Sequence, residues 1–140
     1  MCYKEKWEKN MKIKESFDNF NNPEWCVYDY VMGKVDFSNE YNFVMSISEV
    51  ARTIYITHTF IDEVNNGGFA CYYDQYVMYK EVESCLERIG DIITDNIQEI
   101  TDEESSLLDE LNNEYYDYEE ELIENLRNYT LKNKEEEIKF

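Results

Sequence analysis

The sequence is short of the residues that interrupt helices: it has four glycines and one proline in 140 residues. An all-β domain would need turn residues roughly every 8–12 positions, and this chain does not have them. It has instead long segments in which apolar residues recur at steps of three and four, the spacing of one face of a helix. The sequence therefore predicts an all-α fold, built as a single compact multi-helix domain over residues 1–140.

Residue types that carry catalysis or bind metal are also scarce. His58 is the only histidine, and it falls within an apolar helical stripe, so we expect a hydrogen-bonded core residue. The four cysteines show no CxxC or ligand-like spacing, and we find no phosphate loop, calcium loop or nucleophile elbow. Pairing of Cys71 with His58 is the remaining catalytic alternative, but nothing orients the histidine. We expect no enzyme activity, no metal site and no cofactor.

Positive charge is scarce as well. Thirteen Lys and Arg residues stand against 32 Asp and Glu residues, giving a net charge of −19. Direct binding to nucleic acid is therefore not expected, because little in the chain could neutralise phosphates, and anionic membrane surfaces are disfavoured. No charge-free stretch approaches the ~18–20 residues of a membrane span, and the N-terminus has no apolar signal segment. We expect a cytoplasmic protein with reduced cysteines.

The apolar pattern divides the chain into helical segments. Asn22 and Pro23 form a start signal, as N-cap and first helical residue, for a helix that ends at Gly33. The segment around residues 43–64 has the longest apolar stripe and is predicted to be the central, most buried helix. The other predictions are an amphipathic helix over residues 1–20, helical stripes over residues 82–100 and 107–129, and a frayed tail over residues 132–140.

Negative charge is concentrated in residues 91–124, which hold fourteen acidic residues and no Lys or Arg. On a continuous helix, five of these acids would fall within an arc of about 80°, roughly 115° from an apolar stripe. One helical turn rises about 5.4 Å, comparable to the spacing of phosphates along a strand. A helix break at Asn112-Asn113, or a merely solvated face, are the alternatives. The stripe is Leu111, Tyr115, Tyr118, Leu122 and Leu126; the candidate partner-binding residues are Asp102, Glu103, Glu104, Glu110, Glu114, Asp117, Glu121 and Glu124.

The most specific local string is E-V-N-N-G-G-F at residues 63–69. Two asparagines and two glycines after an apolar helix predict a helix C-terminus and a tight turn with left-handed backbone angles. The asparagine side chains could bond the last open carbonyls or the backbone of the turn. A structural role is therefore predicted for Glu63, Asn65, Asn66, Gly67, Gly68 and Phe69.

Together with Tyr72-Tyr73 and the string L-E-R-I-G at residues 86–90, this motif resembles the bacterial DNA-mimic protein family, over a core of about residues 41–131. The resemblance implies an all-helical acidic protein that can dimerise. It also implies surface carboxylates that occupy the DNA-binding surface of a transcriptional regulator. The chain departs from the family at Cys71, where Gln is usual. The mimicking carboxylates lie outside the motif, so the candidate face rests on the acidic spacing alone.

These observations favour an acidic protein-binding module that regulates transcription as a DNA mimic. Its expected partner is a basic DNA-binding protein such as a helix-turn-helix repressor, attracted by long-range electrostatics. The resemblance and the many aromatic residues are compatible with a homodimer, and monomer and dimer both stay open. Two alternatives remain open: an immunity or antitoxin-like inhibitor of a basic toxin, and a domain without mimicry whose charge serves only solubility.

Overall fold

A computed structural model describes residues 11–17, 22–75, 81–89 and 105–140, with the side chains of residues 69–75, 83, 105–112 and 114 left out. Nearly all regular structure in these residues is helical, which confirms the predicted all-α fold. The helices are α2 (Pro23–Met32), α3 (Glu40–Ser46), α4 (Glu49–Gln75), α5 (Val82–Ile89) and α7 (Ser105–Lys132), with short 3-10 helices η1 (Ile13–Ser16) and η2 (Phe37–Asn39) and strands β1 (Met11–Lys12) and β2 (Glu137–Ile138).

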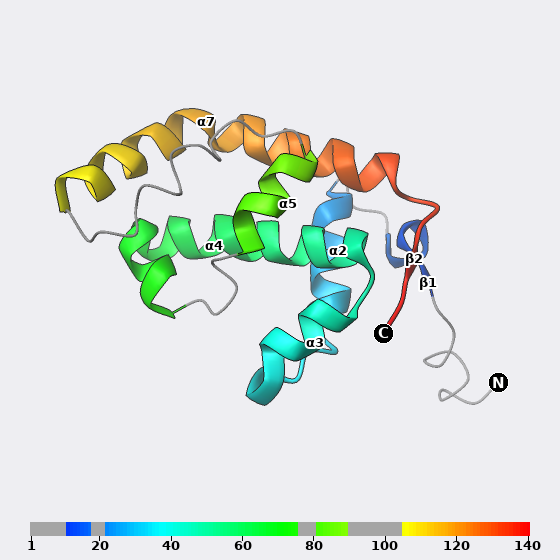
Figure 1. Ribbon diagram of the computed structural model, residues 1–140. Helices are drawn as coiled ribbons and strands as arrows, with labels where there is room; N and C mark the ends of the chain where they lie inside the picture. The colour runs from blue at the N-terminus through cyan, green and yellow to red at the C-terminus, as the bar shows by residue number, and fades with distance from the viewer. Residues whose placement is uncertain (1–10, 18–21, 76–80, 90–104) are drawn as a thin grey trace.

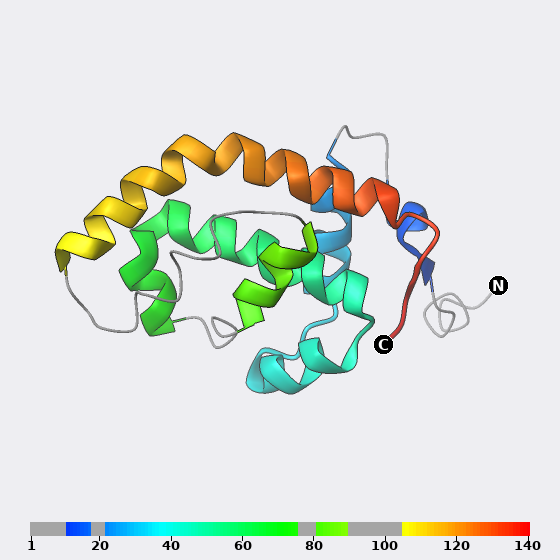
Figure 2. The same ribbon diagram turned by 45° about the horizontal axis from the view of Figure 1, so that its top comes forward.

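Helices α4 and α7 form the frame of the molecule. They lie side by side and antiparallel along its length, and α2 and α5 each contact both of them (Figures 1 and 2). The buried side of α4 includes Ala51, Ile54, Tyr55, Ile56 and Phe60, each at most 1% exposed. The prediction that this segment forms the central, most buried helix is therefore confirmed.

Helix α2 has the boundaries that its sequence signals predict. Asn22 is the N-cap, Pro23 is the first helical residue, and the Gly33 N–H donates to the Asp29 carbonyl at 3.0 Å. Proline suits the first position because that N–H has no partner within the helix. Local sequence is sufficient to define this element.

The predicted central helix is interrupted near its start. Ile47 has extended backbone angles (φ −80°, ψ 170°), so α3 ends at Ser46 and α4 begins at Glu49. The Ser48 N–H donates to the Lys139 carbonyl at 3.1 Å, and Ile47 is only 3% exposed. Burial of Ile47 and a backbone partner from the far end of the chain stabilise this break, which the apolar spacing alone does not show.

The Asn-Asn-Gly-Gly string ends the first helical segment of α4. Gly68 has φ 73° and ψ −175°, and the helix resumes on the far side and continues to Gln75. This combination of angles is essentially restricted to glycine, because a Cβ would clash with the backbone. The predicted helix end and the predicted special backbone conformation are both confirmed, because α4 consists of two helical segments that meet at a kink at Gly68.

The two glycines of the string are expected to respond differently to alanine. Gly68→Ala should lower the free energy of unfolding by about 1–3 kcal/mol, because alanine is strained at the angles of Gly68. Gly67 is exposed and has helical angles, so Gly67→Ala should be neutral or stabilise by up to about 1 kcal/mol. Urea unfolding of both variants measures the difference. Equal effects would contradict the assignment of the bend to Gly68.

Two predictions for the chain ends are wrong. An amphipathic helix over residues 1–20 does not form at residues 11–16, which are strand β1 and the 3-10 helix η1. The tail over residues 132–140 is not frayed: α7 extends to Lys132, and β2 then pairs antiparallel with β1, with Met11 opposite Ile138 (Figure 1). Ile13 and Ile138 are both 0% exposed.

Further hydrogen bonds attach the tail to the N-terminal segment. The Ile13 N–H donates to the Glu136 carbonyl at 2.8 Å, and the Lys14 N–H to the Lys134 carbonyl at 2.9 Å. The ammonium groups of Lys12 and Lys14 lie 3.2 and 2.8 Å from the Glu135 carboxylate. Pairing between distant parts of the chain, rather than local propensity, therefore orders both segments.

Candidate protein-binding surface

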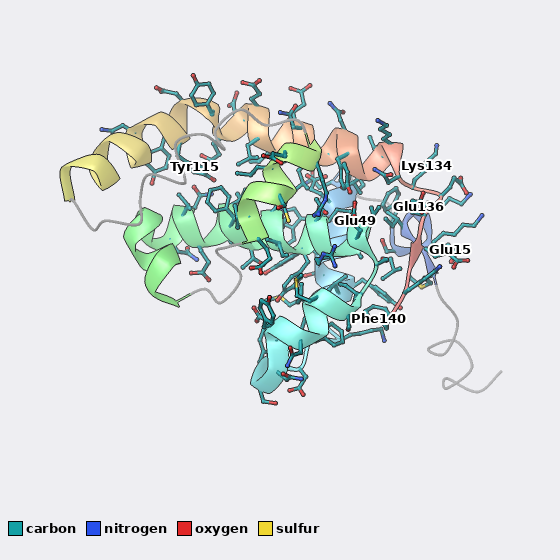
Figure 3. The ribbon with its side chains drawn as sticks, in the orientation of Figure 1. Glu15, Glu49, Tyr115, Lys134, Glu136 and Phe140 are labelled. Carbon is teal, nitrogen blue, oxygen red and sulfur yellow. The ribbon has the colours of Figure 1, made fainter. Side chains whose placement is uncertain are left out.

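Helix α7 docks on the body of the molecule through one side. Tyr115, Leu122, Leu126 and Thr130 are at most 1% exposed, and the Tyr115 ring meets Phe60 of α4 edge-to-face at 6.0 Å. Figure 3 shows Tyr115 between α7 and α4. Tyr118, which was predicted to join this stripe, is 36% exposed. The buried side is therefore centred on a line through residues 115, 122, 126 and 130, away from Tyr118.

The shift of the buried side places the acidic residues farther from the core than predicted. Asp117, Glu121 and Glu124 are all exposed, and on a regular helix they fall within an arc of about 60°, almost directly opposite the buried side. Glu120, which was not among the predicted residues, is also exposed and extends this arc to about 100°. We call these four residues the α7 acidic face.

Helix α7 is continuous over the whole α7 acidic face. α7 continues from Ser105 to Lys132, so the predicted alternative of a break at Asn112-Asn113 does not occur. Consecutive acids of the face are separated by about 5–6 Å along the axis where they lie three or four residues apart. Figure 3 shows side chains along this edge of α7 pointing away from the body of the molecule.

The described ion pairs lie away from this face. In the part of the chain that the structure describes, Lys12 and Lys14 pair with Glu135, Arg88 lies 3.4 Å from Glu49, and Arg127 binds Glu24. No ion pair among these residues involves the α7 acidic face. The four carboxylates are consequently open to solvent and to a cationic partner.

The remaining candidate acids lie at or beyond the edge of what is described. Glu110 and Glu114 belong to α7, one and two turns before Asp117, but their side chains lie outside the described set. Asp102, Glu103 and Glu104 lie outside the described residues altogether. The structure thus brings Asp117, Glu121 and Glu124 together on one face and leaves the other five candidates as predictions.

His58 is a core residue. It is 4% exposed, its ring stacks on Tyr28 at 4.1 Å and meets Trp25 edge-to-face at 4.9 Å, and its Nδ1 lies 3.2 Å from an Asp62 carboxylate oxygen. These contacts orient the ring within the protein.

The side chain of Cys71, the predicted catalytic alternative, lies outside the described set. Burial raises the pKa of the Cys85 thiol to about 11, so this thiol is protonated and unreactive at neutral pH.

The described residues form neither a metal-binding cluster nor a membrane-spanning helix. These residues contain no group of three or more His, Cys, Asp or Glu side chains arranged to hold a metal ion. None of their helices combines the length and the apolar character needed to cross a bilayer.

Comparison with known proteins identifies the region that contains α4, α5 and α7. Residues 45–133 match the DMP19-like protein family. The chain belongs to this family. No curated protein and no solved structure matches it. The DMP19-like region includes the α7 acidic face and the glycine motif, whereas α2 and both strands lie outside it.

Within the DMP19-like region, the glycine motif contacts α7. The Asn65 side-chain amide donates to the Glu119 carboxylate at 2.9 Å, rather than capping the backbone of its own turn as predicted. Asn66 and Gly67 are exposed, and Gly68 provides the bend. Glu63 lines a pocket on another side of α4, and the side chain of Phe69 lies outside the described set. The Asn65–Glu119 bond links the motif to the helix that carries the acidic face.

Proposed function

We propose that this DMP19-like protein is a DNA mimic that binds a basic DNA-binding protein through the α7 acidic face. The observation that carries the proposal is the set of exposed carboxylates of Asp117, Glu120, Glu121 and Glu124, which no described cation neutralises. Membership of the DMP19-like family supports it.

The physical basis is electrostatic resemblance to a nucleic-acid strand. A protein that binds DNA presents cations positioned to neutralise a row of phosphates. A rigid helix that holds carboxylates about 5–6 Å apart along its axis offers those cations a comparable row. The net charge of −19 adds long-range attraction that accelerates encounter with a basic surface.

The class of partner follows from this charge. A transcriptional regulator that uses a helix-turn-helix to contact DNA has the basic surface that the face would occupy, and occupation would release the regulator from its operator. On this proposal the protein regulates transcription without binding nucleic acid itself. Rigid packing of Tyr115, Leu122 and Leu126 beneath the face keeps the carboxylates in place before the partner arrives.

Neutralising the face is expected to weaken binding. The triple variant Asp117→Asn, Glu121→Gln, Glu124→Gln should raise the Kd for the partner by about ten- to hundredfold, mainly through slower association. Candidate helix-turn-helix repressors encoded beside this gene are titrated by calorimetry, and operator duplex should displace the wild-type chain. Affinity should also fall steeply as salt concentration rises.

A matched control removes the same charge elsewhere. The triple variant Glu87→Gln, Glu136→Gln, Glu137→Gln alters three exposed carboxylates away from the face, and we expect its Kd to stay within about threefold of wild type because only the net charge changes. Equal losses in the two variants, or binding that persists unchanged at high salt, would overturn the proposal.

A further inference from the structure

A second feature lies on the other side of α4 from α7. α3 and η2 fold beneath the end of α2 and the middle of α4, at the lower edge of the molecule in both ribbon views (Figures 1 and 2). Between them is a pocket of about 490 Å³, within the roughly 300–1,000 Å³ of ordinary small-molecule sites. It takes no part in the α7 acidic face.

The chemistry of this pocket is aromatic and anionic. Phe37 and Tyr41 contribute exposed aromatic rings, and Glu40 and Glu63 contribute carboxylates. Tyr28 and Tyr55 also line the pocket, but their rings are buried and stack on each other. The other lining residues are Met32, Ser38, Asn39 and Thr59. No Lys, Arg or His is among the lining residues, and no ion pair in the described part of the chain involves Glu40 or Glu63.

The walls are held in place by the core and by neighbouring elements. The Tyr28 and Tyr55 rings stack at 5.5 Å and are 6% and 1% exposed. The Tyr41 hydroxyl donates to the Glu81 carboxylate at 3.2 Å. Phe37 lines the pocket and is 63% exposed, so most of its ring is open to solvent.

The carboxylates are placed where a positive charge would stabilise them. Burial and the nearby Glu63 carboxylate raise the pKa of Glu40 above its ordinary value. Burial and the Glu40 carboxylate likewise raise the pKa of the Tyr55 hydroxyl. Burial is the larger cause of both shifts and the neighbouring carboxylate adds to it, so the space is partly desolvated, and attraction for a cation is stronger there than in water.

We infer that this pocket binds a small organic cation that carries an alkylammonium group. The exposed rings of Phe37 and Tyr41 can attract a cation through their quadrupoles, and alkylammonium groups are ligands that such aromatic sites recognise. The two carboxylates supply the counter-charge. The described residues hold no group of three or more His, Cys, Asp or Glu side chains arranged to bind a metal ion, and the pocket lining has no Lys, Arg or His to attract an anion.

Two probes test the inference on the full-length chain. Choline chloride presents a quaternary ammonium and putrescine dihydrochloride presents primary ammonium groups, and each is titrated at constant ionic strength while amide NMR shifts are recorded. We expect saturable shifts that cluster on the pocket residues for at least one probe. A preference for choline would indicate that the aromatic walls dominate binding, and a preference for putrescine would indicate that the carboxylates do.

Charge-matched variants separate the pocket from the general acidity of the chain. The double variant Glu40→Gln, Glu63→Gln should weaken binding by about tenfold or more, whereas Glu136→Gln, Glu137→Gln, which alters exposed carboxylates near the C-terminus, should change it less than about twofold. Phe37→Ala, at an exposed position whose replacement should not affect folding, should weaken binding by about two- to fivefold. Loss of binding equal in both charge variants, or no saturable shift with either probe, would overturn the inference.

The result does not depend on the DNA-mimic proposal. The pocket variants leave the α7 acidic face intact, and the α7 triple variant leaves Glu40 and Glu63 intact. Cation binding without repressor binding, or the reverse, would therefore identify which of the two is wrong.

Discussion

Replacing Arg127 with alanine is expected to lower the free energy of unfolding by about 3 kcal/mol. Arg127 of α7 binds both carboxylate oxygens of Glu24: Nη2 lies 3.0 Å from Oε1 and Nε lies 3.3 Å from Oε2. Glu24 is only 2% exposed, so the variant would leave a charged carboxylate in the protein interior without its cation. The expected loss lies at the low end of the range for broken buried pairs, because the Arg127 side chain is itself 36% exposed.

Chemical denaturation of Arg127→Ala and of a matched variant, Arg88→Ala, shows whether the loss of stability comes from burial of the carboxylate or from loss of an ion pair alone. Arg88 and Glu49 form an ion pair at 3.4 Å in which Glu49 is 61% exposed, and Arg88→Ala should cost at most about 1 kcal/mol. The double variant Glu24→Leu, Arg127→Met removes both charges of the pair and should recover most of the loss from Arg127→Ala. A small effect of Arg127→Ala, similar to that of Arg88→Ala, would show that Glu24 reaches water or another partner.

The Glu24–Arg127 pair also matters for the candidate surface. It joins α2, which lies outside the DMP19-like match, to α7, which carries the acidic face within it. Arg127 additionally donates to the Asn22 side-chain carbonyl at 2.9 Å. The N-terminal segment therefore holds the orientation of the helix that we propose for partner binding, and it occupies a cation that lies only three residues beyond Glu124.

Features that depend on neighbouring residues could be predicted from the sequence. The start of α2 at Pro23 is predictable because proline geometry acts within one turn, although the Asn22 side chain binds Arg127 instead of capping the helix. The exposure of Asp117, Glu121 and Glu124 follows from helical spacing, once the helix is continuous. Glu120 was missed because the prediction included only acids that follow one another at alternating steps of three and four residues. The exposed side of a docked helix covers a wider arc than that one row.

Features that depend on distant residues could not be predicted. Tyr118 fits the apolar pattern of α7 and Thr130 does not, yet Tyr118 is exposed and Thr130 is buried. The position of α4 decides which side of α7 docks. The apolar spacing likewise runs through Ile47 without a sign of the break. The partner of the Ser48 N–H is Lys139, about ninety positions away in a Lys- and Glu-rich segment whose composition alone indicates fraying.

Ile138→Ala is expected to lower the free energy of unfolding by about 3 kcal/mol, within the range for truncating a buried aliphatic side chain to alanine. Ile138 is 0% exposed and pairs opposite Met11 in the two-stranded sheet. Glu137→Ala, in the same strand but exposed, should change stability by less than about 0.5 kcal/mol. Comparing the two variants by urea unfolding separates loss of core packing from any general effect on the strand.

Hydrogen exchange gives a second, local measurement of the same variant. The amides of Ile13, Lys14 and Ser48 donate to carbonyls of the tail. In Ile138→Ala, the exchange rates of these three amides should therefore increase more than the exchange rates of the core amides of α4. Ile138 lies in β2, and the tail that contains it accepts hydrogen bonds from the 3-10 helix η1 and from Ser48 before α4. Unchanged protection of the three amides would mean that the hydrogen bonds hold the tail without Ile138, and that residues 134–140 are ordered by the backbone alone.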